Sequence, residues 1–175
     1  MGGVNGEALI VVDMLNDFVL PGAPLEVPTA RQVVPAIKAR IEQARARGTA
    51  IIYLCDAHSQ HDQEFKVWPS HAVKGTKGAQ VVEEIAPRPE DLVIEKTTYS
   101  AFYRTRLEEE LKRLKVARLI IVGVLTNICI FFTAVEAVVR GFGVEVPRDS
   151  VATVSQREQD FALEQMEKVF KVKLI

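Results

Sequence analysis

Short apolar segments alternate with segments of helical periodicity along this chain, and that alternation restricts the folds open to it. The predicted strands are 8–14, 49–56, 91–96, 117–124, one within 142–150, and 171–175. The predicted helices are 29–48, which contains Pro35 beyond its first turn, 78–86, 101–115, 127–140 and 157–169. Apolar strands that alternate with helices predict a three-layer α/β domain, in which helices cover both faces of a parallel sheet.

Size and charge narrow the class of protein further. The 175 residues suit a single domain, 1–175, with one sizeable core, and a net charge of -1 offers no attraction to nucleic acid or an anionic membrane. The first residues lack the basic region of a signal peptide, and no apolar stretch is long enough to span a bilayer. Two cysteines far apart in sequence do not make a disulfide framework. We therefore expect a cytoplasmic protein with reduced thiols.

Charged and nucleophilic residues lie where the predicted strands end. Asp13 ends the first strand, Asp56 the second and Lys96 the third. Cys129 lies in the first turn of the helix that follows the fourth strand. Ligands bind beyond the carboxyl ends of the strands in such sheets, so these four side chains predict one site. Taken singly, Cys129 could be a buried structural thiol, Lys96 a solvated charge at a strand end and Asp13 a turn residue.

These residue types suit acyl transfer through a thioester on Cys129. A helix N-terminus and a nearby cation such as Lys96 are expected to lower the pKa of the thiol. Asp13 could accept the thiol proton and later donate it to a leaving amine. Free backbone N–H groups at the start of the helix could bind the oxyanion of a tetrahedral intermediate.

All three histidines lie in one window, residues 56–71, which reads DAHSQHDQEFKVWPSH. Imidazole and carboxylate together suit Zn²⁺, Mn²⁺ or Fe²⁺. Asp56 and His58 would supply two ligands at the strand end, and Glu64 and His71 could close the site from the loop. His61 competes for the place of Glu64. The alternative is a polar surface loop with incidental histidines.

Two aromatic residues could hold a flat ring near this site. Trp68 is the only tryptophan and lies three residues before His71, and Phe18 follows Asp13 by five residues. Aromatic side chains commonly line ligand pockets, where they pack against a planar group. Ordinary core packing is the alternative for both, and it is at least as good an explanation for Phe18.

Three sequence blocks resemble one known family, the isochorismatase-like cysteine hydrolases, and most closely its nicotinamidases of the pyrazinamidase type. The blocks are ALIVVDMLNDFV with Asp13, EKTTYSAFYRT with Lys96 and VGVLTNICIFFTA with Cys129. The resemblance covers nearly the whole chain and implies a six-stranded parallel sheet with these three residues as the catalytic set. It also implies a cis peptide between Val124 and Leu125, which turns the Leu125 N–H toward the oxyanion beside that of Cys129.

The resemblance also implies a metal site and a ring pocket. On the nicotinamidase pattern Asp56, His58 and His71 are ligands of a divalent ion, zinc first and manganese or iron as alternatives. Glu64 takes the variable ligand position, with His61 second. The metal would hold the pyridine nitrogen of the substrate, and the residues implied to line the ring pocket are Phe18, Trp68 and Tyr103.

Two departures from the pattern leave the substrate less defined than the reaction. Leu15 and Ala72 stand where many nicotinamidases have Gln and Cys. The leading hypothesis is a metal-containing nicotinamidase, which forms nicotinate and ammonia and which, like its relatives, is expected to be a homodimer or homotetramer. The alternatives are a related hydrolase of another small amide or ureido compound, a non-catalytic metal- or ligand-binding protein, and a thiol redox sensor that lacks an obvious resolving partner for Cys129.

Overall fold

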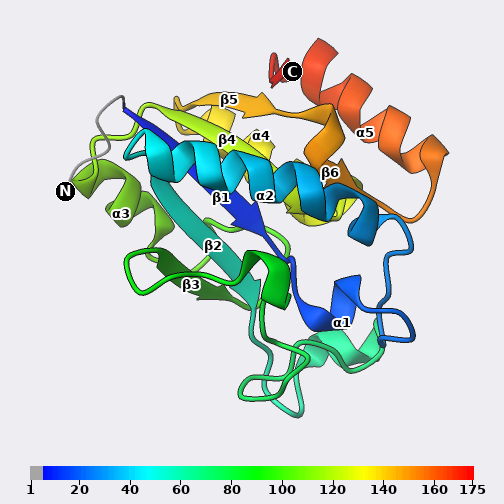
Figure 1. The fold of residues 1–175 in the computed structure, drawn as a ribbon. Coiled ribbons are helices and arrows are strands. Elements are labelled where there is room, and N and C mark those ends of the chain that lie inside the picture. The colour runs from blue at the N-terminus through cyan, green and yellow to red at the C-terminus, as the bar shows by residue number, and fades with distance from the viewer. Residues whose placement is uncertain (1–5) are drawn as a thin grey trace.

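Figure 1 shows the computed structural model of the chain, which describes residues 6–175. A parallel sheet has the strand order β3-β2-β1-β4-β5-β7, and the short β6 pairs with β4. The strands are β1 (Glu7–Val12), β2 (Ala50–Asp56), β3 (Leu92–Lys96), β4 (Arg118–Val124), β5 (Gly143–Val146), β6 (Val151–Ala152) and β7 (Lys173–Leu174). The helices are α1 (Asn16–Val19), α2 (Ala30–Ala46), α3 (Leu107–Arg113), α4 (Phe131–Val139) and α5 (Gln156–Lys168). Single turns of other helix types are η1 (Gln63–Lys66), η2 (Glu83–Ile85), η3 (Thr126–Ile130) and η4 (Arg148–Ser150).

Helices cover both faces of the sheet, which confirms the predicted α/β fold. In the central strand β1, Ala8, Ile10 and Val12 face a core shared with α3 and α4. Leu9 and Val11 face the other core, beneath α2, which crosses the opposite face (Figure 1). Because β1 is buried on both sides, its sequence is continuously apolar rather than alternating. No helix within residues 6–175 is long and apolar enough to cross a membrane.

The prediction of a helix at 78–86 is wrong, because only the single turn η2 is helical in this segment. The preceding residues run antiparallel to the segment after β1 instead. The N–H of Asn16 donates to the carbonyl of Gln80, and the N–H of Val82 donates to the carbonyl of Met14. Backbone groups that make these bonds cannot also make the bonds of a helix.

Other element boundaries also differ from the sequence prediction. The helix predicted at 101–115 begins only at Leu107, because Arg104 adopts a left-handed backbone with a φ of +53° that a helix cannot contain. The helix predicted at 127–140 is divided into the π turn η3 and α4. The two-residue strand β6 was not predicted, so the sheet has seven strands rather than six.

Replacing Gly123 with alanine should strongly destabilise the fold. Gly123 lies in β4 with a φ of +120°, and a Cβ there would overlap the carbonyl oxygen of Val12 in β1. Backbone strain and overpacking together predict a loss of about 3 kcal/mol or more in the free energy of unfolding, measured by urea denaturation. Gly141→Ala is the control, since Gly141 has a φ of +87° but a Cβ there would meet no other part of the protein within 4 Å. It should lose only about 1 kcal/mol, and equal losses in both variants would contradict the steric argument.

Candidate functional site

The side chain of Lys96 is buried at the end of β3, where it joins residues from three other parts of the chain. Its Nζ lies 2.6 Å from Asp56 Oδ1 and 2.7 Å from Asp13 Oδ2. The same atom lies 3.6 Å from Cys129 Sγ and donates to the carbonyl of Thr98 at 3.1 Å. Burial alone would lower the pKa of Lys96, but the two carboxylates raise it well above its ordinary value. The structure therefore brings the four residues at the predicted edge into one cluster around a cation.

Asp13 occupies a tightly defined position just after β1. Its backbone is left-handed, with a φ of +50°, and its N–H donates to the carbonyl of Leu54 in β2. Its Oδ1 accepts the backbone N–H of Asp56 at 2.9 Å. Burial and the carboxylate of Asp56 raise the pKa of Asp13 to about 6, against the opposite effect of Lys96. A carboxyl with a pKa near neutrality can both accept and donate a proton.

The thiol of Cys129 lies in η3, the π turn between β4 and α4, and is buried. Burial raises its pKa well above the ordinary value; Lys96 lowers it, but Asp13 and Asp56 raise it further. The expectation that the helix start and Lys96 would lower the pKa of this thiol is therefore corrected, because burial and two carboxylates outweigh them. The resting thiol keeps its proton and needs an acceptor, and Asp13 is the nearby group suited to that role.

A second cluster lies beside the first and contains the histidine window. Asp56, His58 and His71 each present a ligand atom, and these atoms lie within 4.8 Å of one another. Glu64 Oε1 is 3.9 Å from His71 Nε2, so Glu64 also reaches the cluster. The imidazole of His61 takes no part in this group, and His61 is exposed on the loop. The arrangement favours Glu64 over His61 as the fourth group.

The chemistry of this second cluster fits a divalent metal ion. Within the described residues Nε2 of His58 has no hydrogen-bond partner, although it lies 3.7 Å from Asp56 Oδ2, and Nδ1 lies 3.2 Å from Asp62 Oδ2 without an aligned hydrogen bond. His71 Nδ1 is 2.7 Å from the carbonyl of Pro69, which can only accept, so the Nε2 lone pair of His71 remains free. Two imidazoles and two carboxylates form a donor set that suits Zn²⁺, Mn²⁺ or Fe²⁺.

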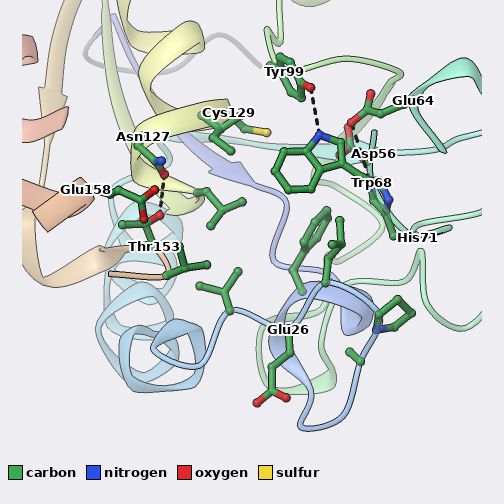
Figure 2. A pocket seen from close by; sticks show the side chains of 18 residues that line it. Glu26, Asp56, Glu64, Trp68, His71, Tyr99, Asn127, Cys129, Thr153 and Glu158 are labelled. Carbon is green, nitrogen blue, oxygen red and sulfur yellow. Dashed lines mark hydrogen bonds and ion pairs between the residues drawn. The ribbon is translucent and has the colours of Figure 1, made fainter. Parts of the chain in front are cut away.

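One cavity of about 400 Å³ gives access to both clusters (Figure 2). Cys129 and the adjacent Leu125 line it, and the peptide between Val124 and Leu125 is cis, as the family resemblance implies. Phe18 and Trp68 line it as well. An aromatic molecule in this cavity would therefore contact aromatic side chains, the thiol and the metal-ligand candidates at the same time.

The structure does not place Tyr103 in this cavity, because half of its surface is exposed to solvent elsewhere. Tyr99 lines the cavity instead, and its hydroxyl accepts the indole N–H of Trp68 at 3.1 Å. Sequence reasoning also missed Asn127 and Thr153, whose side chains are hydrogen-bonded at 2.5 Å on the cavity wall. Tyr99 and Asn127 lie within three residues of Lys96 and Cys129, and that spacing could have indicated them. Thr153 follows the unpredicted strand β6, so no comparable signal existed.

The isochorismatase domain family matches residues 7–174 of the chain. The uncharacterized isochorismatase family protein YaaI of Bacillus subtilis is 32% identical over 163 residues, which are 93% of this chain and 90% of that protein. The pyrazinamidase of Pyrococcus horikoshii, solved in complex with zinc, is 33% identical with a TM-score of 0.92, over 97% of this chain and 98% of that one. N-carbamoylsarcosine amidase from Thermoplasma acidophilum is 32% identical with a TM-score of 0.87, over 96% and 94%.

Iodoacetamide should alkylate Cys129 faster than Cys55, by at least roughly tenfold. Cys129 lines the cavity and has Asp13 nearby to take its proton, whereas Cys55 is packed in the core beneath α2. Burial raises the pKa of both thiols, so the expected difference in rate comes from access to the cavity and from the nearby Asp13. Mass spectrometry of peptides after timed exposure measures both rates, and a Cys55→Ala variant should leave the faster rate unchanged. Equal labelling of the two thiols would contradict the geometry described above.

Proposed function

The chain belongs to the isochorismatase family, and we propose that it is a metal-containing amidohydrolase that converts nicotinamide and water to nicotinate and ammonia. One observation carries the proposal: a thiol beside a buried carboxylate–ammonium pair shares a single cavity with a cluster of two histidines and two carboxylates. The first group can break an amide bond, and the second can hold an ion that orients an aromatic substrate.

In the proposed reaction Asp13 accepts the proton of Cys129 as the sulfur attacks the amide carbon. The backbone N–H groups of Leu125 and Cys129 would donate to the oxyanion of the tetrahedral intermediate. Asp13 then protonates the amide nitrogen, ammonia leaves and a thioester remains on Cys129. Lys96 stays charged throughout and limits the repulsion between the ionised groups around it.

The second half of the reaction uses the same residues in reverse. A water molecule takes the place of ammonia, loses a proton to Asp13 and attacks the thioester carbon. The carbon–sulfur bond breaks, and Asp13 returns the proton to the sulfur of Cys129. The carboxylic acid product gives its remaining proton to solvent and leaves as the carboxylate. Because Asp13 alternates between acceptor and donor, a pKa of about 6 suits it better than that of an ordinary carboxyl.

Asp56, His58, Glu64 and His71 would hold the metal ion. When bound, the ion supplies a positive centre that accepts the electron pair of a ring nitrogen. Phe18 and Trp68 would pack against the ring and exclude water from it. The zinc-containing relative is called a pyrazinamidase, and pyrazinamide, like nicotinamide, is an amide on a nitrogen-containing aromatic ring.

The described lining of the cavity offers no lysine or arginine to an anionic substrate. Among the described residues, the charged lining of the cavity consists of carboxylates and includes no Lys or Arg; these carboxylates belong to Glu26, Asp56, Glu64 and Glu158. Isochorismate and N-carbamoylsarcosine carry carboxylates, which are usually bound by arginine or lysine. Nicotinamide carries no charge and needs no such partner. This contrast supports nicotinamide over the carboxylate substrates of other family members.

Purified, metal-loaded protein should release ammonia from nicotinamide and from pyrazinamide, and far more slowly from N-carbamoylsarcosine. Loss of the nucleophile in Cys129→Ala should reduce the rate by roughly ten-thousand-fold while the protein remains folded. A coupled ammonia assay measures each rate. Absence of release from nicotinamide would refute the substrate, and full activity of Cys129→Ala would refute the mechanism.

Removal of the metal with a chelator should abolish nicotinamide hydrolysis, and one of zinc, manganese or iron should restore it. Glu64→Ala should bind less metal than the unaltered protein, because a carboxylate of the donor set is lost. His61→Ala is the matched control, since this exposed residue lies outside the cluster and its loss should leave metal content unchanged. Elemental analysis after dialysis measures metal content, and the reverse order of the two variants would assign the ligand to His61.

A further inference from the structure

Asp62 lies between two of the proposed metal ligands and contacts both. Its Oδ1 accepts the backbone N–H of Glu64 at 3.0 Å, at the start of η1. Its Oδ2 lies 3.2 Å from Nδ1 of His58. The carboxylate is only 21% exposed, and Oδ2 faces an imidazole that is completely buried. One side chain outside the ligand set therefore holds the backbone of one ligand and faces the ring of another.

The contact with His58 bears on which ring nitrogen carries the proton. A neutral imidazole has one N–H and one lone pair, and only the lone pair can bind a metal. In His58, Nε2 points toward Asp56 and the cluster, whereas Nδ1 points toward Asp62. An ionised carboxylate can only accept a hydrogen bond, so it favours the tautomer with the proton on Nδ1. That tautomer leaves the lone pair of Nε2 directed at the cluster.

The same logic already operates at the second histidine with a different acceptor. His71 Nδ1 faces the carbonyl of Pro69 at 2.7 Å, which directs the lone pair of Nε2 into the cluster. Among the described residues no carbonyl accepts a hydrogen bond from Nδ1 of His58, and the carboxylate of Asp62 lies 3.2 Å from this atom, close to it but not aligned as a hydrogen bond. Each proposed histidine ligand thus has an acceptor behind it, as is usual for metal-bound histidines.

We propose that Asp62 is a positioning residue of the metal site, which selects the metal-binding tautomer of His58 and holds Glu64 in place. The inference rests on the metal site of the proposed function. It predicts that Asp62 governs metal affinity through its charge and acceptor character, and not only by capping η1.

Two substitutions separate these roles because both remove the same charge. In Asp62→Asn the amide oxygen can still accept the N–H of Glu64, and Asn caps helical turns about as well as Asp. With that oxygen engaged, the amide NH₂ faces Nδ1 of His58 and donates to it. This donation stabilises the tautomer with the proton on Nε2, which cannot bind metal. Asp62→Ala loses the cap but imposes no wrong tautomer.

Competition with a chromophoric chelator measures the dissociation constant for Zn²⁺ in the three proteins. Asp62→Ala should weaken zinc binding roughly 10-fold and Asp62→Asn roughly 100-fold, the range expected for residues behind metal ligands. Nitrogen-15 NMR of the metal-free proteins at alkaline pH measures the tautomer directly, and with three histidines the spectrum is simple. The His58 proton should be on Nδ1 in the unaltered protein and on Nε2 in Asp62→Asn.

The outcomes distinguish this inference from the proposed function. Zinc affinity that is retained in Asp62→Asn and lost in Asp62→Ala would reduce Asp62 to a cap and overturn the inference. A proton on Nε2 of His58 in the unaltered protein would overturn it as well, even if nicotinamide is hydrolysed. Absence of zinc binding by the unaltered protein would overturn the metal site together with this role. Equal melting temperatures of the metal-free proteins would exclude misfolding as the cause of lost affinity.

Discussion

The buried ammonium group of Lys96 is the charge on which the rest of the site depends. Without it, the carboxylates of Asp13 and Asp56 would face each other in the protein interior, where an unpaired charge costs several kcal/mol. The pairing follows from strand register, because Asp56 at the end of β2 lies directly opposite Lys96 at the end of β3. The ammonium therefore links the stability of the sheet edge to the ionisation of the groups that surround the thiol.

Asp56 connects the two halves of the site through its two oxygens. Oδ1 accepts from Lys96 at 2.6 Å, while Oδ2 faces Nε2 of His58 at 3.7 Å. Burial would raise the pKa of Asp56, but Lys96 and His58 hold it below the ordinary value, so the group is ionised as a metal ligand must be. The same carboxylate also raises the pKa of Asp13. A change of charge at the metal site would therefore change the pKa of Asp13, the group that exchanges protons with Cys129.

The sequence was most informative where one local rule decides the outcome. Continuous apolar runs identified β1 and β4. Because the carboxyl ends of parallel strands lie at one edge of the sheet, the cluster of Asp13, Lys96 and Cys129 could be predicted without coordinates. Contacts between distant segments were invisible by contrast. The 78–86 region pairs with the chain around α1, which overrides its local tendency to form a helix. Tyr99 lines the cavity where Tyr103 was expected. The backbone is left-handed at Arg104, and Tyr103 is exposed.

The electrostatics of the cavity affect how the product of the proposed reaction is bound. A neutral amide enters a cavity whose charged lining, within the described residues, consists of carboxylates. Hydrolysis converts it to a carboxylate beside Asp13 and Asp56, with the ammonium of Lys96 already engaged by both. Like charges repel each other, so the carboxylates of Asp13 and Asp56 disfavour the anionic product, whereas a metal ion held by Asp56 would attract it. The two carboxylates that raise the pKa of the resting thiol therefore also repel the anionic product.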